Sequence, residues 1–285
     1  MQSSATRSVS PHGIQWHFAP QHDIHLPKHD AMRLMQKRCN HVLGQHPAII
    51  NNDFLEKLEH ESVSLISFLT AMNQQAIFWR QLVLVREHHA LILAENARYP
   101  ELRYSSLPVA VCFDSQGIPW CPPLPESGLG DPYALSERLH EWWGSWQNAF
   151  PMLEGRGYGL RQADPATRQL CEHLDSYYNA AGVATALGTM VAIESALSTD
   201  CWERLRRASQ RVCDRMGRPL PAESFLITSE AHSRLQARHA LHLLDMRCHS
   251  GDLEEDEFFR AVKACLTHLA AFEQAQAVRL RPELH

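Results

Sequence analysis

Three polar residues share one face of the helix that the sequence predicts over residues 221–248. His232, Gln236 and His239 are separated by four and three positions, so that at about 100° per residue they fall on one stripe. Two imidazoles placed in this way can ligate one or two metal ions, and the residue between them can bind the metal or orient a ligand. The same spacing also suits a polar surface stripe, because charged residues such as Glu230 are interspersed. Both interpretations stay open on this helix alone.

A second triplet on the same predicted helix has a comparable spacing. His242, Asp245 and His249 also share a face, but that face is rotated away from the first. The leucines around them do not single out either face, so we rank this triplet second.

A single carboxylate stands inside an apolar run of small residues. Glu194 follows the sequence Gly-Thr-Met-Val-Ala-Ile at 188–193 and precedes Ser-Ala-Leu. Burying a carboxylate in such surroundings is costly unless it is paired or bound to a cation. The sequence therefore indicates a metal ligand, with a rim position that reaches water as the alternative.

A further candidate pair lies on the helix predicted over residues 136–150. Glu137 and His140 are three positions apart, a spacing that can present two ligands from one inward stripe. Charged helices also produce this pattern by chance, and the tryptophans at 142, 143 and 146 suit either a pocket wall or the core. Two carboxylates, three imidazoles and one carboxamide together suit iron, with manganese as a rival.

These residues need a scaffold of helices, and the sequence predicts one. Strand signals are scarce, so we expect an all-α, single-domain helical bundle over residues 31–280 after an N-terminal extension of residues 1–30. Asn52 or Asp53 is expected to cap a helix that begins at Phe54, and Asp164-Pro165 to start another. The longer predicted helices cover residues 62–95, 133–150, 165–180, 185–216, 221–248 and 254–278.

The segment 99–131 interrupts the helical pattern with many prolines and several glycines. We expect a long irregular loop, with a short extended piece at 109–113. Such loops are often active-site lids, but an insertion without chemistry is an equal alternative.

Composition narrows the function classes. The chain has 285 residues and a formal net charge of -5 with scattered Lys and Arg, which argues against a nucleic-acid partner. Apolar runs are too short to span a membrane, and no signal-peptide pattern opens the chain. The eight cysteines include no CxxC pair, so we expect reduced, mostly buried thiols and a cytoplasmic protein. Several of the 18 histidines lie in the first 46 residues, which suits a polar extension or loose metal binding.

The order of these motifs resembles the heme-oxygenase-like diiron oxidases, and the likeness covers roughly residues 40 to 275. Segments at 46–69 and 164–194 also look like the corresponding parts of that superfamily. The resemblance implies a helical bundle that binds one or two iron ions without heme and uses dioxygen on a small fatty-acid- or amino-acid-like substrate in a biosynthetic pathway. The ligands that it implies are Glu137, His140, Glu194, His232, Gln236 and His239.

One residue departs from the family pattern, because Gln236 stands where an Asp is expected. A neutral amide is a weaker ligand and lowers the affinity for a second iron. The protein would then hold one iron, hold two with a carboxylate such as Glu230, or have lost the oxidative chemistry. If the register of the first ligand helix differs, Glu95 with His88, or Glu101, would replace Glu137 and His140.

Two other functions remain open. The metal-free branch of the same fold, similar to thiaminase-type and pyrroloquinoline-quinone-synthase-type enzymes, uses His and Glu as acid–base groups in a closed pocket. A non-catalytic protein that handles metal or binds another protein is the second alternative, and a homodimer is also compatible with the sequence.

Overall fold

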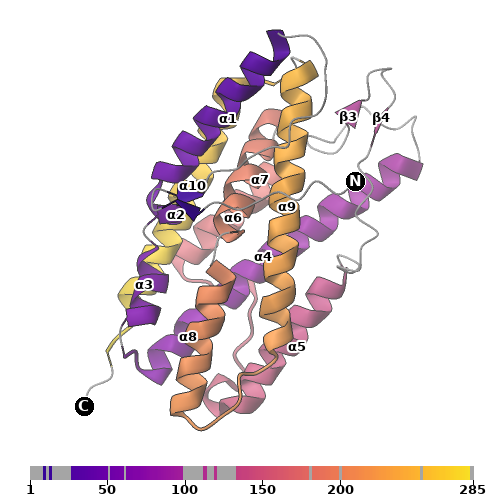
Figure 1. The fold of residues 1–285 in the computed structure, drawn as a ribbon. Coiled ribbons are helices and arrows are strands. Elements are labelled where there is room, and N and C mark those ends of the chain that lie inside the picture. The colour runs from indigo at the N-terminus through magenta and orange to yellow at the C-terminus, as the bar shows by residue number, and fades with distance from the viewer. Residues whose placement is uncertain are drawn as a thin grey trace, which may run out of the picture.

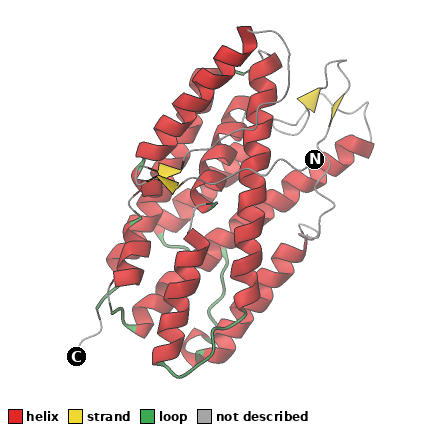
Figure 2. Ribbon diagram, viewed as in Figure 1, coloured by secondary structure: helices red, strands yellow, loops and turns green. Residues whose placement is uncertain are grey.

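Helices make up nearly all of the regular structure in the computed structural model of the protein (Figures 1 and 2). The structure describes residues 9–10, 13–14, 27–50, 52–60, 62–98, 112–113, 119–120, 133–179, 182–198, 201–250 and 253–282. Within these ranges it describes the backbone alone at 9–10, 13–14, 27–33, 36, 86–98, 112–113, 119–120, 133–135, 177–179, 183, 232, 235, 238–239, 241–243 and 245–250.

The elements follow one another along the chain as a series of helices. The helices are α1 (Pro27–Gln45), α2 (Pro47–Ile50), α3 (Asp53–His60), α4 (Leu65–Arg98), α5 (Tyr133–Ala149), α6 (Pro165–Asn179), α7 (Val183–Leu197), α8 (Cys201–Arg215), α9 (Glu223–Ser250) and α10 (Glu255–Arg279). Two short 3₁₀ helices, η2 (Pro151–Leu153) and η3 (Leu160–Gln162), lie between α5 and α6. Two-residue strands form the antiparallel pairs β1 (Val9–Ser10) with β2 (Gly13–Ile14) and β3 (Cys112–Phe113) with β4 (Pro119–Trp120). The predicted all-α, single-domain bundle is confirmed.

Helix α7 lies at the centre of the bundle, between α9 and α10 (Figure 1). Every residue described from Ala184 to Ser198 is buried. A helix that is apolar all round is typical of the interior of a bundle. The remaining helices pack around this centre, with α1 against α9 and α6 against both α4 and α10.

The contact between α7 and α10 is close because it has a glycine at its centre. A Cβ atom added at Gly188 would lie 2.4 Å from the backbone oxygen of Phe258 and 3.0 Å from the Cβ of Ala261. Only glycine therefore allows the two helix backbones to approach this closely.

Aromatic side chains fill the core where α4, α5, α8 and α9 meet. The ring of Trp79 lies 5.2 Å from Trp142, 4.9 Å from Trp202 and 5.7 Å from Phe225, measured between centroids. Trp142 and Trp146 are completely buried. These tryptophans therefore belong to the packed core.

A pair of histidines joins α6 to α10. The rings of His173 and His268 lie 4.4 Å apart between centroids, and His173 is 8% exposed. Burial, together with the charge of His268, lowers the pKa of His173 to about 4. His173 is therefore neutral in the folded protein at neutral pH.

Several predicted helix boundaries are confirmed. The backbone N–H of Leu55 donates to the Asn52 side chain at 3.0 Å, and that of Thr167 donates to the Asp164 carboxylate at 2.6 Å. Both contacts are N-caps. Gly217, with a φ of 62°, ends α8 where the Gly-Arg-Pro sequence predicts a stop.

The prediction of one continuous helix over residues 185–216 is wrong. Helix α7 ends at Leu197 and α8 begins at Cys201. At the break, the Ser198 hydroxyl donates to the backbone oxygen of Ser195 at 3.1 Å. The sequence Ser-Thr-Asp at 198–200 consists of residues that favour helix caps over helix interiors, and this signal decides the boundary.

Other predictions can be compared with the structure only in part. Helix α1 begins at Pro27, ahead of the boundary expected at residue 31. Most of the proline-rich segment 99–131 lies outside the described residues, although Cys112–Phe113 is extended as predicted. The cysteines with described side chains form no disulfide and are mostly buried. No helix in the described ranges is long and apolar enough to cross a membrane.

Replacing Gly188 by alanine tests the close contact between α7 and α10. The added methyl group meets backbone that cannot move aside cheaply, so Gly188→Ala should lower the free energy of unfolding by about 1–3 kcal/mol. Urea denaturation measures this change. Gly44→Ala is the matched control, because a Cβ at Gly44 in α1 meets nothing within 4 Å, and it should leave stability unchanged or raise it by about 0.5–1 kcal/mol. An equal effect of the two substitutions would argue against the close contact.

The lowered pKa of His173 predicts a loss of stability in mild acid. Between pH 6.5 and about 4 the unfolded chain binds a proton at this residue that the folded chain does not. The free energy of unfolding should therefore fall across this window as the pH is lowered, by up to about 3 kcal/mol from this residue. Denaturation series at several pH values should show a shallower fall for His173→Gln than for the wild type. His60→Gln, at an exposed position, should keep the wild-type slope, and a wild-type slope in His173→Gln would contradict the assignment.

Candidate functional site

The carboxylate of Glu194 lies deep inside the bundle. Its residue is 1% exposed, and Val191, Ile193 and Leu197 beside it on α7 are buried apolar residues. Glu194 takes part in a hydrogen-bond or electrostatic interaction. Burial raises the pKa of the Cys265 thiol on α10 to about 12, and the negative charge of Glu194 contributes to this increase. The alternative of a rim position that reaches water is therefore excluded for Glu194.

Helical periodicity shows which face of α7 carries Glu194. Thr185 contacts the Glu257 carboxylate of α10, and Gly188 packs against the α10 backbone. Glu194 is rotated by about 180° from Thr185 and about 120° from Gly188 around the helix axis. It therefore lies to one side of the Gly188 contact, where its charge still acts on Cys265 of α10. The other extensive neighbour of α7 is α9.

A hydrogen bond between α8 and α9 shows how α9 runs relative to α7. The Trp202 indole N–H donates to the Ser233 hydroxyl at 3.1 Å. Trp202 lies just after α7, and α9 runs in the opposite direction to α7 and α8 (Figure 1). Residues before the C-terminal end of α7 therefore lie level with residues of α9 that follow Ser233. The segment of α9 that follows Ser233, which carries Gln236 and His239, therefore runs back alongside α7.

The buried stripe of α9 borders the predicted ligand stripe. Ser233, Ala237, Ala240 and Leu244 are buried. Gln236 is half-buried and takes part in a hydrogen-bond or electrostatic interaction. By helical periodicity His232, Gln236 and His239 occupy the strip of α9 beside that stripe. The side chains of His232 and His239 lie outside the described part of the structure.

The structure does not bring Glu137 and His140 to Glu194. Both are exposed on the outer side of α5, whereas Leu139 and Trp142 face the core. The prediction of an inward stripe for this pair is wrong, because burying the large apolar residues fixes the rotation of α5. The His140 Nδ1 atom instead lies 3.0 Å from the hydroxyl of Tyr158.

The remaining candidates fall where the structure gives no side-chain description. This holds for the fallback ligands Glu95 and His88 on α4 and for the second triplet, His242, Asp245 and His249, while Glu101 lies outside the described residues altogether. Among the residues with described side chains, no group of three or more His, Cys, Asp or Glu could hold a metal ion. A metal site on α7 and α9 therefore depends on His232 and His239.

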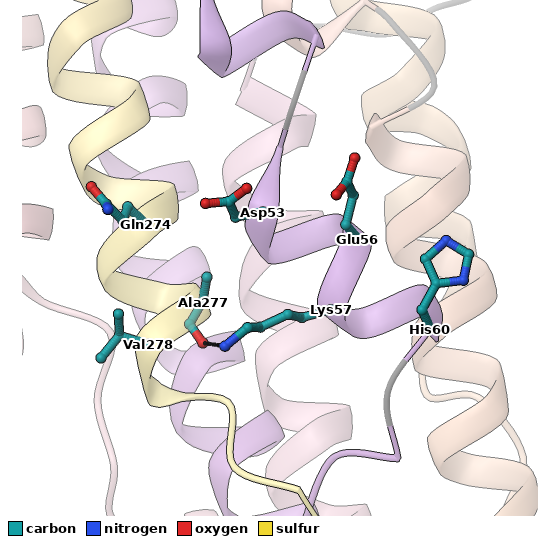
Figure 3. A pocket seen from close by; sticks show the side chains of 7 residues that line it. All are labelled: Asp53, Glu56, Lys57, His60, Gln274, Ala277 and Val278. Atoms are coloured by element: carbon teal, nitrogen blue, oxygen red, sulfur yellow. Dashed lines mark hydrogen bonds between the residues drawn. The ribbon is translucent and has the colours of Figure 1, made fainter.

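The structure also shows polar sites that the sequence reasoning missed. His173 occupies a position on the apolar stripe of α6, next to the buried Leu174, and that spacing could have indicated a buried histidine. A hollow of about 360 Å³ lies between α3 and α10, where Asp53, Glu56 and His60 face outward (Figure 3). Lys57 lies among them and donates to the backbone oxygen of Ala277 at 3.1 Å. This ammonium group makes the hollow a poor place for a cation.

Comparison with known proteins supports the fold and leaves the function open. No family model and no curated protein matches the sequence. The chain is similar in structure to a CADD-like protein of unknown function from Nostoc punctiforme, with a TM-score of 0.54 and 15% sequence identity. The match covers 87% of this chain and 98% of the other. The chain therefore shares the helical fold of a CADD-like protein.

Proposed function

We propose that the protein is a non-heme iron oxidase or oxygenase whose metal is held between α7 and α9. The observation that carries this proposal is the burial of Glu194 at 1% exposure on α7, a helix that packs against both α9 and α10. A carboxylate at this depth needs a compensating cation or a set of hydrogen-bond donors to offset its desolvation. Glu194 already takes part in a hydrogen-bond or electrostatic interaction, and a divalent metal ion bound between the two helices would add to that compensation.

The residues of the two helices suit iron. Glu194 offers a charged oxygen ligand, and His232 and His239 offer two imidazoles in the strip of α9 beside the buried stripe. Carboxylate and imidazole ligands together are typical of non-heme iron sites. Ala237 and Ala240 are small and buried, so they place no bulky side chain at this level of α9. Glu137 and His140 are left out of the proposed ligand set because they are exposed.

Gln236 sets the charge of the proposed site. Its neutral amide adds no charge, so Glu194 is the one carboxylate of the proposed ligand set, which favours one iron over two. A second iron would need a further carboxylate, such as the half-buried Glu230. That side chain is already paired with Arg234 at 2.5 Å, so the pair would have to break.

Bound iron would supply the chemistry of dioxygen, and the chain supplies the surroundings in which a small substrate reacts. Met190, Val191 and Leu197 are buried on α7, so the proposed site has apolar walls that exclude water. Together with the resemblance in motif order, this setting favours a small amino-acid- or fatty-acid-like substrate. The similarity to the structure of a CADD-like protein supports the helical fold on which this proposal is based.

Iron loading tests the proposal. The full chain, incubated with ferrous iron without oxygen and then desalted, should retain about one ion per chain. Glu194→Gln keeps the shape of the side chain and removes its charge, so it should reduce retention to about a tenth or less. His239→Ala should have a similar effect. Elemental analysis of the desalted protein measures the retained iron.

The matched control is Glu273→Gln on α10. Glu273 is also buried, and it accepts a hydrogen bond of 2.6 Å from the Asn52 amide. This control should keep wild-type iron retention, and circular dichroism should show that all variants are folded. Equal retention in Glu194→Gln and wild type would contradict the proposal. An enzyme that is active without iron would favour the metal-free branch of the fold.

A further inference from the structure

An open hollow of about 460 Å³ lies on the outer side of α5, against the segment that connects α5 to α6. Arg80 of α4, His140 and Trp143 of α5, and the glycine-rich segment 155–159 line it. This hollow takes no part in the proposed iron site, because it is lined by α4, α5 and the segment 155–159, whereas the proposed site lies between α7 and α9.

The lining of the hollow is positively charged in an acidic protein. Arg80 and Arg156 contribute guanidinium groups, and His140 contributes an imidazole, whereas no Asp or Glu is among the lining residues. The chain as a whole has a formal net charge of -5. A concave surface lined by one sign of charge attracts ligands of the opposite sign.

The glycine-rich segment is held so that its carbonyl groups bond to the bundle. The Arg156 oxygen accepts hydrogen bonds from the Trp143 indole and the Gln147 amide, both at 2.9 Å. The Gly157 oxygen accepts one from the Asn73 amide at 3.0 Å. These two carbonyl oxygens, which would repel an anion, are therefore occupied by hydrogen bonds within the protein. Within the described ranges, the N–H groups of residues 157–159 have no protein acceptor.

The side-chain donors are fixed around Tyr158. The Arg80 guanidinium lies 5.8 Å from the centre of the Tyr158 ring. Its Nη1 atom is also close to Gly159, because a Cβ atom added to that glycine would lie 3.7 Å from it. Burial raises the pKa of Tyr158, so its hydroxyl is protonated at neutral pH. That hydroxyl can donate to Nδ1 of His140 at 3.0 Å, which leaves the Nε2–H of the ring as a donor.

We propose that this hollow binds the oxyanion group, phosphate or carboxylate, of a small molecule, with Arg80 as the principal charged contact. The planar guanidinium group can donate two parallel hydrogen bonds to such a group. The N–H groups of the glycine-rich segment and the His140 ring add uncharged donors around it. The absence of side chains at the three glycines lets the ligand approach the backbone closely.

Calorimetric titration of the full chain with inorganic phosphate, against sodium chloride at equal ionic strength, tests this proposal. A parallel titration with acetate distinguishes the two kinds of oxyanion. Saturable binding of either anion is expected, and Arg80→Gln should weaken it about tenfold. His140→Gln should also weaken it, by a smaller factor.

Arg161→Gln is the matched control. Arg161 is exposed in η3 close to the hollow but does not line it, so this substitution makes the same change in charge outside the site. It should alter the affinity by less than about twofold. Binding of phosphate, acetate or both that depends on Arg80 and not on Arg161 supports the proposal. No saturable binding, or equal weakening by both arginine substitutions, overturns it, and neither result bears on iron retention.

Discussion

The structure depends on the burial of α7, a helix that is covered on every side and carries one carboxylate, Glu194. Its neighbours α9 and α10 must cover it from opposite sides, and Gly188 brings α10 into direct backbone contact. That contact fixes the rotation of α7 and leaves Glu194 buried beside it. A carboxylate buried in this way carries a desolvation cost that must be offset by nearby charges or hydrogen-bond donors. The proposed iron site follows from this constraint and from the direction in which α9 runs past α7.

Polar chemistry is divided between the interior and the outer surface of the bundle. Inside, the Glu194 carboxylate lies among buried apolar residues of α7. Outside, α5 presents Glu137 and His140 to solvent because its tryptophans occupy the core. His140 consequently faces Tyr158 and Arg80 in the outer hollow. Glu137 and His140 were predicted to share one metal site with Glu194. In the structure, α5 instead holds them on its outer side, away from the buried Glu194.

The sequence predicts the helical architecture well, because apolar periodicity and helix caps are local signals. Asn52 and Asp164 cap helices as their residue types indicate, and the buried Glu194 could be recognised from its apolar neighbours alone. The rotation of α5 could not be predicted from the Glu-x-x-His spacing, since it is decided by packing of Trp142 against Trp79 of a distant helix. The break after Leu197 was available in the sequence, but its capping residues were outweighed by the helical periodicity on either side. The hollow at Tyr158 depends on contacts between segments far apart in the chain, which no local pattern contains.

The most direct test of this account is a crystal structure of the iron-loaded protein, with anomalous diffraction recorded at the iron absorption edge. The account predicts an iron peak between α7 and α9, with the Glu194 carboxylate and the imidazoles of His232 and His239 about 2.0–2.5 Å from the metal. A peak elsewhere in the molecule, or ligand atoms of these three residues that do not converge on one ion, would contradict it.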